Sequence, residues 1–150
     1  MVYLGIDPGK KGGLALISAD AVEVFPYSDE KLKEICCALD RKIHAAGEQV
    51  MCCLEQVHAM PKQGVTSTFN FGMSYGYIKG LLEIAGIPYQ EIPPQRWKKE
   101  FGLNTDKQKS IEVCRKLFPD VSLKANDRCR VDNDGMAEAL LMAEYARRKL

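Results

Sequence analysis

The sequence lacks any apolar run of about twenty residues, the length that a membrane-spanning helix needs. Its first residues form neither a basic leader nor a small-residue cleavage site, so they do not indicate secretion. We therefore expect a protein that inserts into no membrane and stays in the cytoplasm. Its 150 residues are enough for a hydrophobic core, and we expect one domain over residues 1–150.

Metal-binding patterns of cysteine and histidine are also absent. No Cys-x-x-Cys or His-x-x-x-His spacing occurs among the six cysteines and two histidines. A disulfide framework is typical of short secreted chains, whereas two adjacent cysteine pairs here lie inside apolar stretches, as small core residues do. We therefore expect reduced thiols and no zinc site. The cysteines are Cys36, Cys37, Cys52, Cys53, Cys114 and Cys129.

A large charge of one sign is missing as well. The formal net charge of +1 neither indicates nor excludes a polyanionic partner. The distribution of charge is more informative, because residues 96–130 contain ten Lys and Arg against five acids. Such a segment can be a solvated face or a surface that contacts phosphates, and the sequence leaves both interpretations open.

Hydrophobic periodicity predicts strands at the start of the chain and mostly helices later. The first three apolar runs are short and closely connected, which indicates an antiparallel meander. Ser28 can cap the first helix, which Gly47 ends, and the Thr-Ser-Thr segment 66–68 is expected to cap the second. The expected strands are residues 2–7, 13–18, 21–26, 49–55 and 87–92, and the expected helices are residues 28–46, 66–86, 95–101, 106–118 and 134–148.

The second helix carries a stripe of three glycines. Gly72, Gly76 and Gly80 recur every four residues, so they share one face. Because each costs about 0.5–1 kcal/mol of helix stability relative to alanine, the stripe suggests close approach by another element. The protein's own sheet is the expected partner, and a second copy of the chain is the alternative.

Four acids lie where apolar elements begin or end. Asp7 ends the first strand, just before a Pro-Gly turn, and Glu55 ends the fourth. Asp134 and Glu138 lie one turn apart at the start of the last helix. Taken singly, Asp7 can be a turn residue, Asp134 a helix cap and Glu138 a favourable charge near a helix N-terminus.

Taken together, the four acids predict a cation site. If the first and fourth strands are neighbours, three or four carboxylates meet in one place. Clustered carboxylates repel one another, so such a cluster persists only if the acids are protonated or bind cations. Oxygen ligands without a histidine partner suit hard cations such as Mg²⁺ or Mn²⁺.

Four motifs stand in order along the chain: Gly5-Ile6-Asp7-Pro8-Gly9 with Gly12-Gly13, Leu54-Glu55-Gln56-Val57 with Met60-Pro61-Lys62-Gln63-Gly64, Pro93-Pro94-Gln95-Arg96-Trp97-Lys98-Lys99, and Asp134-Gly135-Met136-Ala137-Glu138-Ala139-Leu140. With the order of elements, they resemble the RuvC-type Holliday-junction resolvases, in particular the small phage and bacterial members. The resemblance covers essentially the whole chain. It implies an α/β, RNase H-like fold, in which a five-stranded mixed sheet combines a three-strand antiparallel meander with two parallel strands and is flanked by helices.

Carried over residue by residue, the resemblance implies that Asp7, Glu55 and Asp134 are catalytic acids that bind Mg²⁺, two ions per site, with Mn²⁺ as a substitute. In the best-known members the last two acids are three residues apart, but the residue three before Asp134 is Val131, which cannot ligate a metal. The expected fourth acid is Glu138, as in relatives with an Asp-Gly-x-Ala-Glu pattern.

The alternative fourth acid is Asp132, in the loop before the last helix. Either choice leaves the implied activity the same, namely a structure-selective endonuclease that resolves Holliday junctions and related branched DNA by symmetric paired nicks. The implied reaction is a two-metal-ion hydrolysis that leaves 5′-phosphate and 3′-hydroxyl ends. Because two opposing strands are cut, members of the family act as twofold homodimers with one site per subunit.

Contacts with DNA are expected from basic side chains to phosphates and from two phenylalanines that could stack on bases. Helical spacing also allows core packing for one of these phenylalanines, and Trp97 is assigned to the core. The expected nucleic-acid-binding residues are Lys62, Phe69, Phe71, Arg96, Lys98, Lys99, Lys107, Lys109, Arg128 and Arg130.

Two other functions are weighed against this one. Asp-x-Gly after a first strand also opens the phosphate-binding hairpin of actin-like ATPases and sugar kinases, which share the RNase H-like core. Those proteins need two such lobes, and Lys10 and Lys11 stand here in place of their small hydroxyl residues. A junction-binding protein without nuclease activity would lack one of the core acids, whereas all three are present.

Overall fold

A five-stranded mixed sheet forms the centre of the computed structural model, which describes residues 1–59, 61–62, 64–103 and 107–150, the side chain of Lys107 excepted. The strands are β1 (Val2–Asp7), β2 (Gly13–Ile17), β3 (Val22–Pro26), β4 (Val50–Glu55) and β5 (Tyr89–Ile92). Their spatial order is β3-β2-β1-β4-β5. β1 pairs antiparallel with β2 and parallel with β4, so the first and fourth strands are neighbours. The predicted sheet is therefore confirmed.

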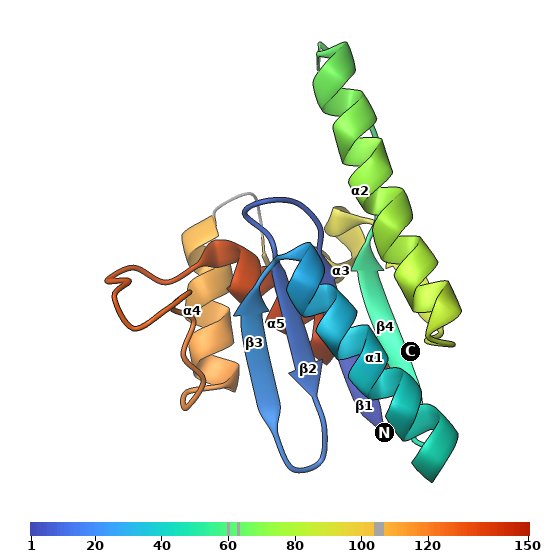
Figure 1. The fold of residues 1–150 in the computed structure, drawn as a ribbon. Helices are drawn as coiled ribbons and strands as arrows, with labels where there is room; N and C mark the ends of the chain where they lie inside the picture. The colour runs from blue at the N-terminus through green and yellow to red at the C-terminus, as the bar shows by residue number, and fades with distance from the viewer. Residues whose placement is uncertain (60, 63, 104–106) are drawn as a thin grey trace.

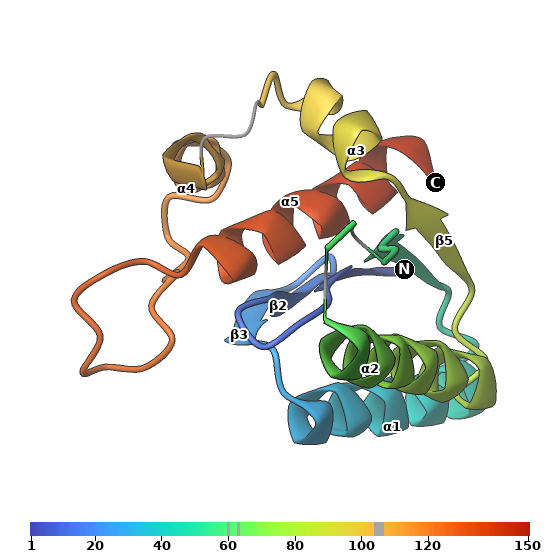
Figure 2. The ribbon, with the colours of Figure 1, turned by 90° about the horizontal axis from the view of Figure 1, so that it is seen from above.

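Helices cover both faces of this sheet. They are α1 (Asp29–Ala46), α2 (Val65–Ile84), α3 (Pro94–Glu100), α4 (Lys107–Leu117) and α5 (Asp134–Lys149). Figure 2 shows α1 and α2 on one face and α3, α4 and α5 on the other. The N-terminal half of α2 extends past the end of the sheet (Figure 1). No helix among the described residues is long and apolar enough to cross a membrane.

The sheet separates two hydrophobic cores. The alternation of side chains along each strand determines to which core a residue belongs. Successive side chains of a strand point to opposite faces. Leu4, Ile6 and Leu54 belong to the core beneath α1 and α2. Asp7 follows Ile6 and Glu55 follows Leu54, so both carboxylates point to the opposite face, which α5 covers.

The α5 helix lies against the sheet at backbone distance. A side-chain carbon on Gly5 in β1 would overlap the backbone oxygen of Ala139 in α5. One on Gly13 in β2 would come within 2.5 Å of the backbone oxygen of Gly135, also in α5. Only glycine leaves room for this approach. The glycines of the first and last motifs therefore fix the height and register of α5 over β1 and β2.

Capping explains both boundaries of α1, but no side-chain cap marks the start of α2. The Ser28 side chain accepts a backbone hydrogen bond at 3.1 Å where α1 begins, and Gly47 ends this helix with a φ of 63°, as predicted. The predicted cap of α2 is wrong, because Gly64 occupies the N-cap position without a side-chain hydrogen bond. Thr68, in the predicted capping segment, instead donates its hydroxyl to the Gly64 carbonyl from inside the helix.

The interpretation of the glycine stripe on α2 as a contact with the sheet is also wrong. A side-chain carbon on Gly72, Gly76 or Gly80 would meet no atom within 4 Å. The buried side of α2 is formed by other residues, including Ile78 and Leu82. The glycine stripe therefore faces away from the domain, and within one chain nothing described covers it.

We expect Gly5→Ala to lower the free energy of unfolding by about 1–3 kcal/mol or more, because the added methyl has to displace helix backbone rather than a flexible side chain. The matched control is Gly72→Ala, where the methyl meets no atom of the same chain, so at a concentration where the chain is monomeric the change should be near neutral or stabilising by about 0.5–1 kcal/mol. Urea unfolding curves measure both. Equal effects of the two substitutions would contradict the close approach of α5.

Candidate active site

Asp7 and Glu55 stand at the carboxyl ends of neighbouring parallel strands. The register of β1 and β4 pairs Ile6 with Leu54, directly before the two acids. Both carboxylates leave the sheet at the same edge and on the same face. Their proximity thus follows from strand pairing and pleat alone.

The start of α5 brings two more acids to this edge. Asn133 caps the helix, since its side chain accepts the Met136 N–H at 2.9 Å, so the explanation of Asp134 as the cap is wrong. A side-chain carbon on Gly135 would overlap the backbone of the β1–β2 turn, so Asp134 lies beside the turn that follows β1. Glu138 follows one helical turn later and is almost fully buried against the sheet.

Three acids lie close enough to Asp7 to change its ionisation. Burial raises the pKa of Asp7 from 3.8 to about 8, and the charges of Glu55, Glu138 and Asp134 contribute to this rise. Lys98 acts in the opposite direction. The structure therefore places the other three predicted carboxylates within electrostatic range of Asp7, and the buried site favours a proton or a cation on Asp7.

Two elements on the α5 side of the sheet contact these acids directly. The Lys98 ammonium in α3 forms an ion pair with Glu138 at 3.1 Å, and the Ser110 hydroxyl in α4 donates to the same carboxylate at 3.3 Å. The Trp97 indole N–H donates to Glu55 at 3.2 Å. Lys98, predicted as a phosphate contact, thus lies at the acid cluster, and its ammonium sits 5.1 Å from the centre of the Trp97 ring.

The pKa of Glu55 is raised overall, although some of its neighbours act in the opposite direction. Burial raises the pKa of its carboxyl, the hydrogen bond from Trp97 lowers it, Glu138 raises it, and Lys98 lowers it. The sequence assigned Trp97 to the core, which is confirmed because its side chain is fully buried. Its contact with Glu55 was missed. The available signal was a lone Trp beside a lysine in the third motif, since a buried indole N–H needs an acceptor.

The donor set fits hard divalent cations on chemical grounds. The cluster contains four carboxylates, and neither histidine nor cysteine is among the groups that shift the pKa of Asp7. Among the described residues, however, no three His, Cys, Asp or Glu side chains are arranged as a ready-made metal site. The Lys98 ammonium supplies part of the positive charge that a cation would bring. Binding of a cation therefore requires the side chains to close in.

Asp132, the alternative fourth acid, has a different environment. Its carboxylate pairs with Arg115 of α4, and burial together with the charge of this carboxylate raises the pKa of Cys114. It is not among the groups that shift the pKa of Asp7. The geometry therefore favours Glu138 over Asp132 as the fourth member of the cluster.

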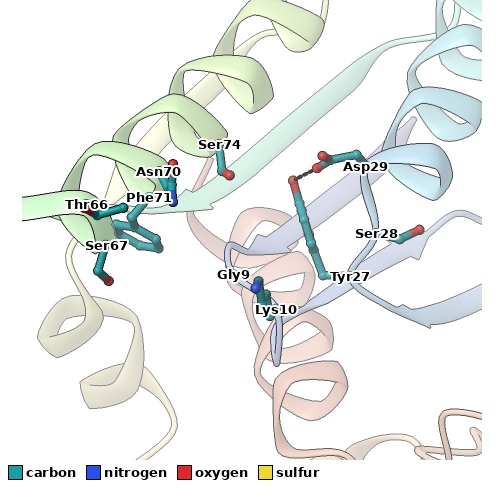
Figure 3. A pocket seen from close by; sticks show the side chains of 10 residues that line it. All are labelled: Gly9, Lys10, Tyr27, Ser28, Asp29, Thr66, Ser67, Asn70, Phe71 and Ser74. Atoms are coloured by element: carbon teal, nitrogen blue, oxygen red, sulfur yellow. Dashed lines mark hydrogen bonds between the residues drawn. The ribbon is translucent and has the colours of Figure 1, made fainter. Parts of the chain in front are cut away.

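A cavity of about 850 Å³ opens next to the β1–β2 turn, two residues after Asp7. Figure 3 shows the Phe71 ring reaching into it from α2, with Tyr27 on the opposite side. The Tyr27 hydroxyl donates to Asp29 at 2.9 Å (Figure 3). The lining combines aromatic rings, hydroxyls, an amide, one ammonium and one carboxylate, and its residues are Gly9, Lys10, Tyr27, Ser28, Asp29, Thr66, Ser67, Asn70, Phe71 and Ser74.

The remaining predicted DNA contacts are mostly at the surface. Neither phenylalanine belongs to a core: Phe69 is 64% exposed, and Phe71 is half-buried at the cavity. Lys107 begins α4, but its side chain lies outside the described residues. Lys62 is exposed in the segment before α2. The other predicted contacts on α3, α4 and the segment that leads to α5 are exposed, and they are Arg96, Lys99, Lys109, Arg128 and Arg130.

The sheet order and the acids at the ends of β1 and β4 define an RNase H-like domain with a four-carboxylate candidate site. Among solved structures, the chain is similar to Thermus thermophilus RuvC in complex with a Holliday junction substrate, with a TM-score of 0.58 and 19% sequence identity over 99% of this chain and 97% of that one. A further Thermus thermophilus RuvC structure gives a TM-score of 0.57 and 22% identity, covering 99% and 96%.

The yeast mitochondrial Holliday junction resolvase Ydc2 has the same fold, with a TM-score of 0.52, 15% identity and coverage of 97% of this chain and 77% of that one. No protein-family model matches the chain, and no curated protein matches its sequence. At these identities the likeness is one of fold. It confirms the RuvC-type, RNase H-like fold that the four motifs predicted.

We expect Asp7→Asn to stabilise the metal-free protein at pH 8–9. Folded Asp7 keeps its proton up to a pKa of about 8, whereas the unfolded carboxyl releases it near 3.8, so the folded state binds more protons between these values. The stability of the wild type therefore falls as the pH rises through this range, and the variant escapes this loss. The difference should reach on the order of a few kcal/mol at high pH and vanish below pH about 4.

Thermal melting in EDTA across this pH range measures the effect. Added Mg²⁺ should stabilise the wild type and not the variant, because only the wild type keeps all the carboxylates. A variant that is less stable than the wild type at pH 9 would contradict the burial of an acid cluster at this edge.

Proposed function

We propose that this chain is a Mg²⁺-dependent endonuclease that resolves Holliday junctions and related branched DNA by paired nicks. The observation that carries the proposal is the gathering of Asp7, Glu55, Asp134 and Glu138 at one edge of the sheet, where burial and mutual repulsion raise the pKa of Asp7 to about 8. The fold shared with RuvC and Ydc2 supports the choice of substrate.

The four carboxylates would hold two Mg²⁺ ions, which Mn²⁺ could replace. Ions bound there would supply Lewis-acid chemistry for the scissile phosphate, the attacking water and the leaving 3′-oxygen, and the ends would be a 5′-phosphate and a 3′-hydroxyl. Glu55 and Glu138 are held before binding by Trp97 and Lys98 respectively. Lys98 would release Glu138 as the site fills, and its ammonium would then face the phosphate backbone.

The DNA would lie across the edge of the sheet where the acids gather. Exposed basic residues on α3 and α4 flank this edge on the α5 side and would contact phosphates, which makes binding salt-dependent. On the other side, the cavity beside Phe71 would receive an unstacked base near the crossover. A junction separates its strands at the crossover, so it offers the phosphate and the unstacked base together.

A second copy of the chain would cover the outer face of α2. Large apolar side chains are exposed on this helix, and an exposed apolar patch is typical of a surface that contacts another protein. The glycine stripe opens onto this outer face. The exposed apolar residues of α2 are Val65, Phe69, Met73, Tyr77 and Ile84. A twofold dimer through α2 would present one site to each of the two strands that are cut.

The decisive test is cleavage of a labelled four-way junction with and without Mg²⁺. We expect the wild type to make two symmetric nicks only with the metal. Asp7→Asn should reduce the cleavage rate by at least about 100-fold, because even loss of an outer partner of a metal ligand typically costs about 10–100-fold, while junction binding in a gel-shift assay changes little. A wild type that binds the junction and never cuts it would instead favour a junction-binding protein.

The matched pair Glu138→Gln and Asp132→Asn serves as the internal control of this assay. Each variant removes one charge near the start of α5, but only Glu138 belongs to the cluster around Asp7. Glu138→Gln should lose most of the activity, and Asp132→Asn should keep most of it. The reverse ranking would move the fourth ligand to the loop.

We expect Gly76→Leu to split the dimer and to leave the monomer folded, because the site of the new side chain is empty within the chain. Ala45→Leu, which also introduces a leucine but at an exposed position of α1, should leave the dimer intact. Light scattering and far-ultraviolet circular dichroism at micromolar concentration distinguish the two outcomes. A wild type that stays monomeric even with junction DNA would contradict paired nicking by a dimer.

A further inference from the structure

Glu55 is contacted from outside the acid cluster by a residue that the proposed chemistry does not use. The Trp97 indole N–H donates to Glu55 Oε1 at 3.2 Å. Trp97 has 0% of its surface exposed and lies in the core on the α5 side of the sheet. Trp97 is the only tryptophan in the chain.

Local structure explains how Trp97 reaches this acid. β5 pairs in parallel with β4 so that Ile92 lies opposite Glu55. The chain turns directly afterwards through Pro93, and Pro94 begins α3. Trp97 therefore stands one turn into a short helix that starts beside Glu55. Because the proline pair fixes the start of α3, the indole approaches from a defined direction.

A tryptophan is not needed here for packing alone. A leucine or phenylalanine fills a core without carrying a polar atom, whereas an indole N–H that is buried without a partner is costly. Glu55 is the acceptor of that N–H. In return, the buried carboxylate receives a donor, which restricts its rotation about the last side-chain bond.

We propose that Trp97 is a positioning residue for Glu55, holding one carboxylate oxygen so that the other is directed toward the cation site. This rests on the proposed function, because it takes Glu55 as a metal ligand. Trp97 itself contacts neither substrate nor metal. Outer hydrogen bonds of this kind orient metal ligands, and their removal typically weakens metal binding about 10–100-fold.

The first measurement is Mn²⁺ affinity, determined by electron paramagnetic resonance without DNA. Trp97→Phe should bind Mn²⁺ about tenfold more weakly than the wild type. Because this change also removes volume, a second variant replaces Trp97 with benzothienylalanine, which keeps the shape of indole and has sulfur in place of the N–H. It should show the same weakening with a melting temperature close to that of the wild type.

The matched control is Tyr89→Phe. Tyr89 lies on β5, the strand before Trp97, and its hydroxyl donates to Glu83. The substitution therefore deletes another aromatic donor to a glutamate and leaves Glu55 untouched. Its Mn²⁺ affinity should equal that of the wild type. A double-mutant cycle combines the sulfur isostere of Trp97 with Glu55→Gln. In protein that carries Glu55→Gln, the replacement of Trp97 should have no further effect on Mn²⁺ binding.

Trp97 also provides its own spectroscopic signal. Since no other tryptophan is present, all indole fluorescence comes from beside Glu55. Added Mg²⁺, which does not quench fluorescence as Mn²⁺ does, should shift the emission of the wild type and leave that of Glu55→Gln unchanged.

The outcomes separate the two proposals. If the wild type binds Mn²⁺ and the sulfur isostere binds it equally well, Trp97 has no positioning role and the proposed function stands. If the wild type binds no Mn²⁺, the proposed function fails and the role of Trp97 fails with it. A tenfold loss in the isostere that persists in the Glu55→Gln background would also overturn the proposal, because the effect would then not pass through Glu55.

Discussion

The close approach of α5 to β1 and β2 is the constraint on which the candidate site depends. Glycines at positions 5, 13 and 135 let the helix backbone rest on the strand backbones, and a single added methyl at any of them would overlap a backbone atom or nearly so. This contact fixes the position of the first turn of α5 over the sheet. Asp134 and Glu138 therefore lie at the edge of the sheet where β1 and β4 end in Asp7 and Glu55. The glycines contribute no chemistry themselves, yet the acids meet only because the glycines are there.

The acid cluster is held together against its own repulsion. Burial and three neighbouring carboxylates raise the pKa of Asp7 to about 8, so the metal-free site costs the fold stability at neutral pH. Lys98 and Ser110 on Glu138, and Trp97 on Glu55, offset part of this cost. A partly compensated cost in stability is typical of functional sites, where an unfavourable local arrangement is offset by the stability of the rest of the fold.

The sequence predicted what local patterns determine. Short apolar runs that end in an acid placed Asp7 and Glu55 at strand ends, and the parallel pairing of β1 and β4 was sufficient to bring them together. The cap of α2 was mistaken because Gly64 starts the helix without any side-chain signal. The partner of the glycine stripe was mistaken because helical spacing shows that residues share a face, not where that face points. The contact between Trp97 and Glu55 joins residues 42 positions apart and depends on the pairing of β5 with β4, which no local pattern encodes.

The α2 helix contacts the strand end that carries Glu55 with its inner side, and its outer side is the exposed apolar face. The Tyr75 hydroxyl lies 2.7 Å from the Glu91 carboxylate and 3.2 Å from the Glu55 backbone carbonyl, and Lys79 pairs with the same Glu91 at 2.8 Å. A displacement of α2 along its axis would therefore disturb the backbone of a cluster residue. Since Trp97 holds the side chain of Glu55 from the other face of the sheet, the position of this acid depends on both layers of the protein at once. A second copy docked on the outer face of α2 would thus steady the strand end that carries Glu55 as well as place a second site opposite the first.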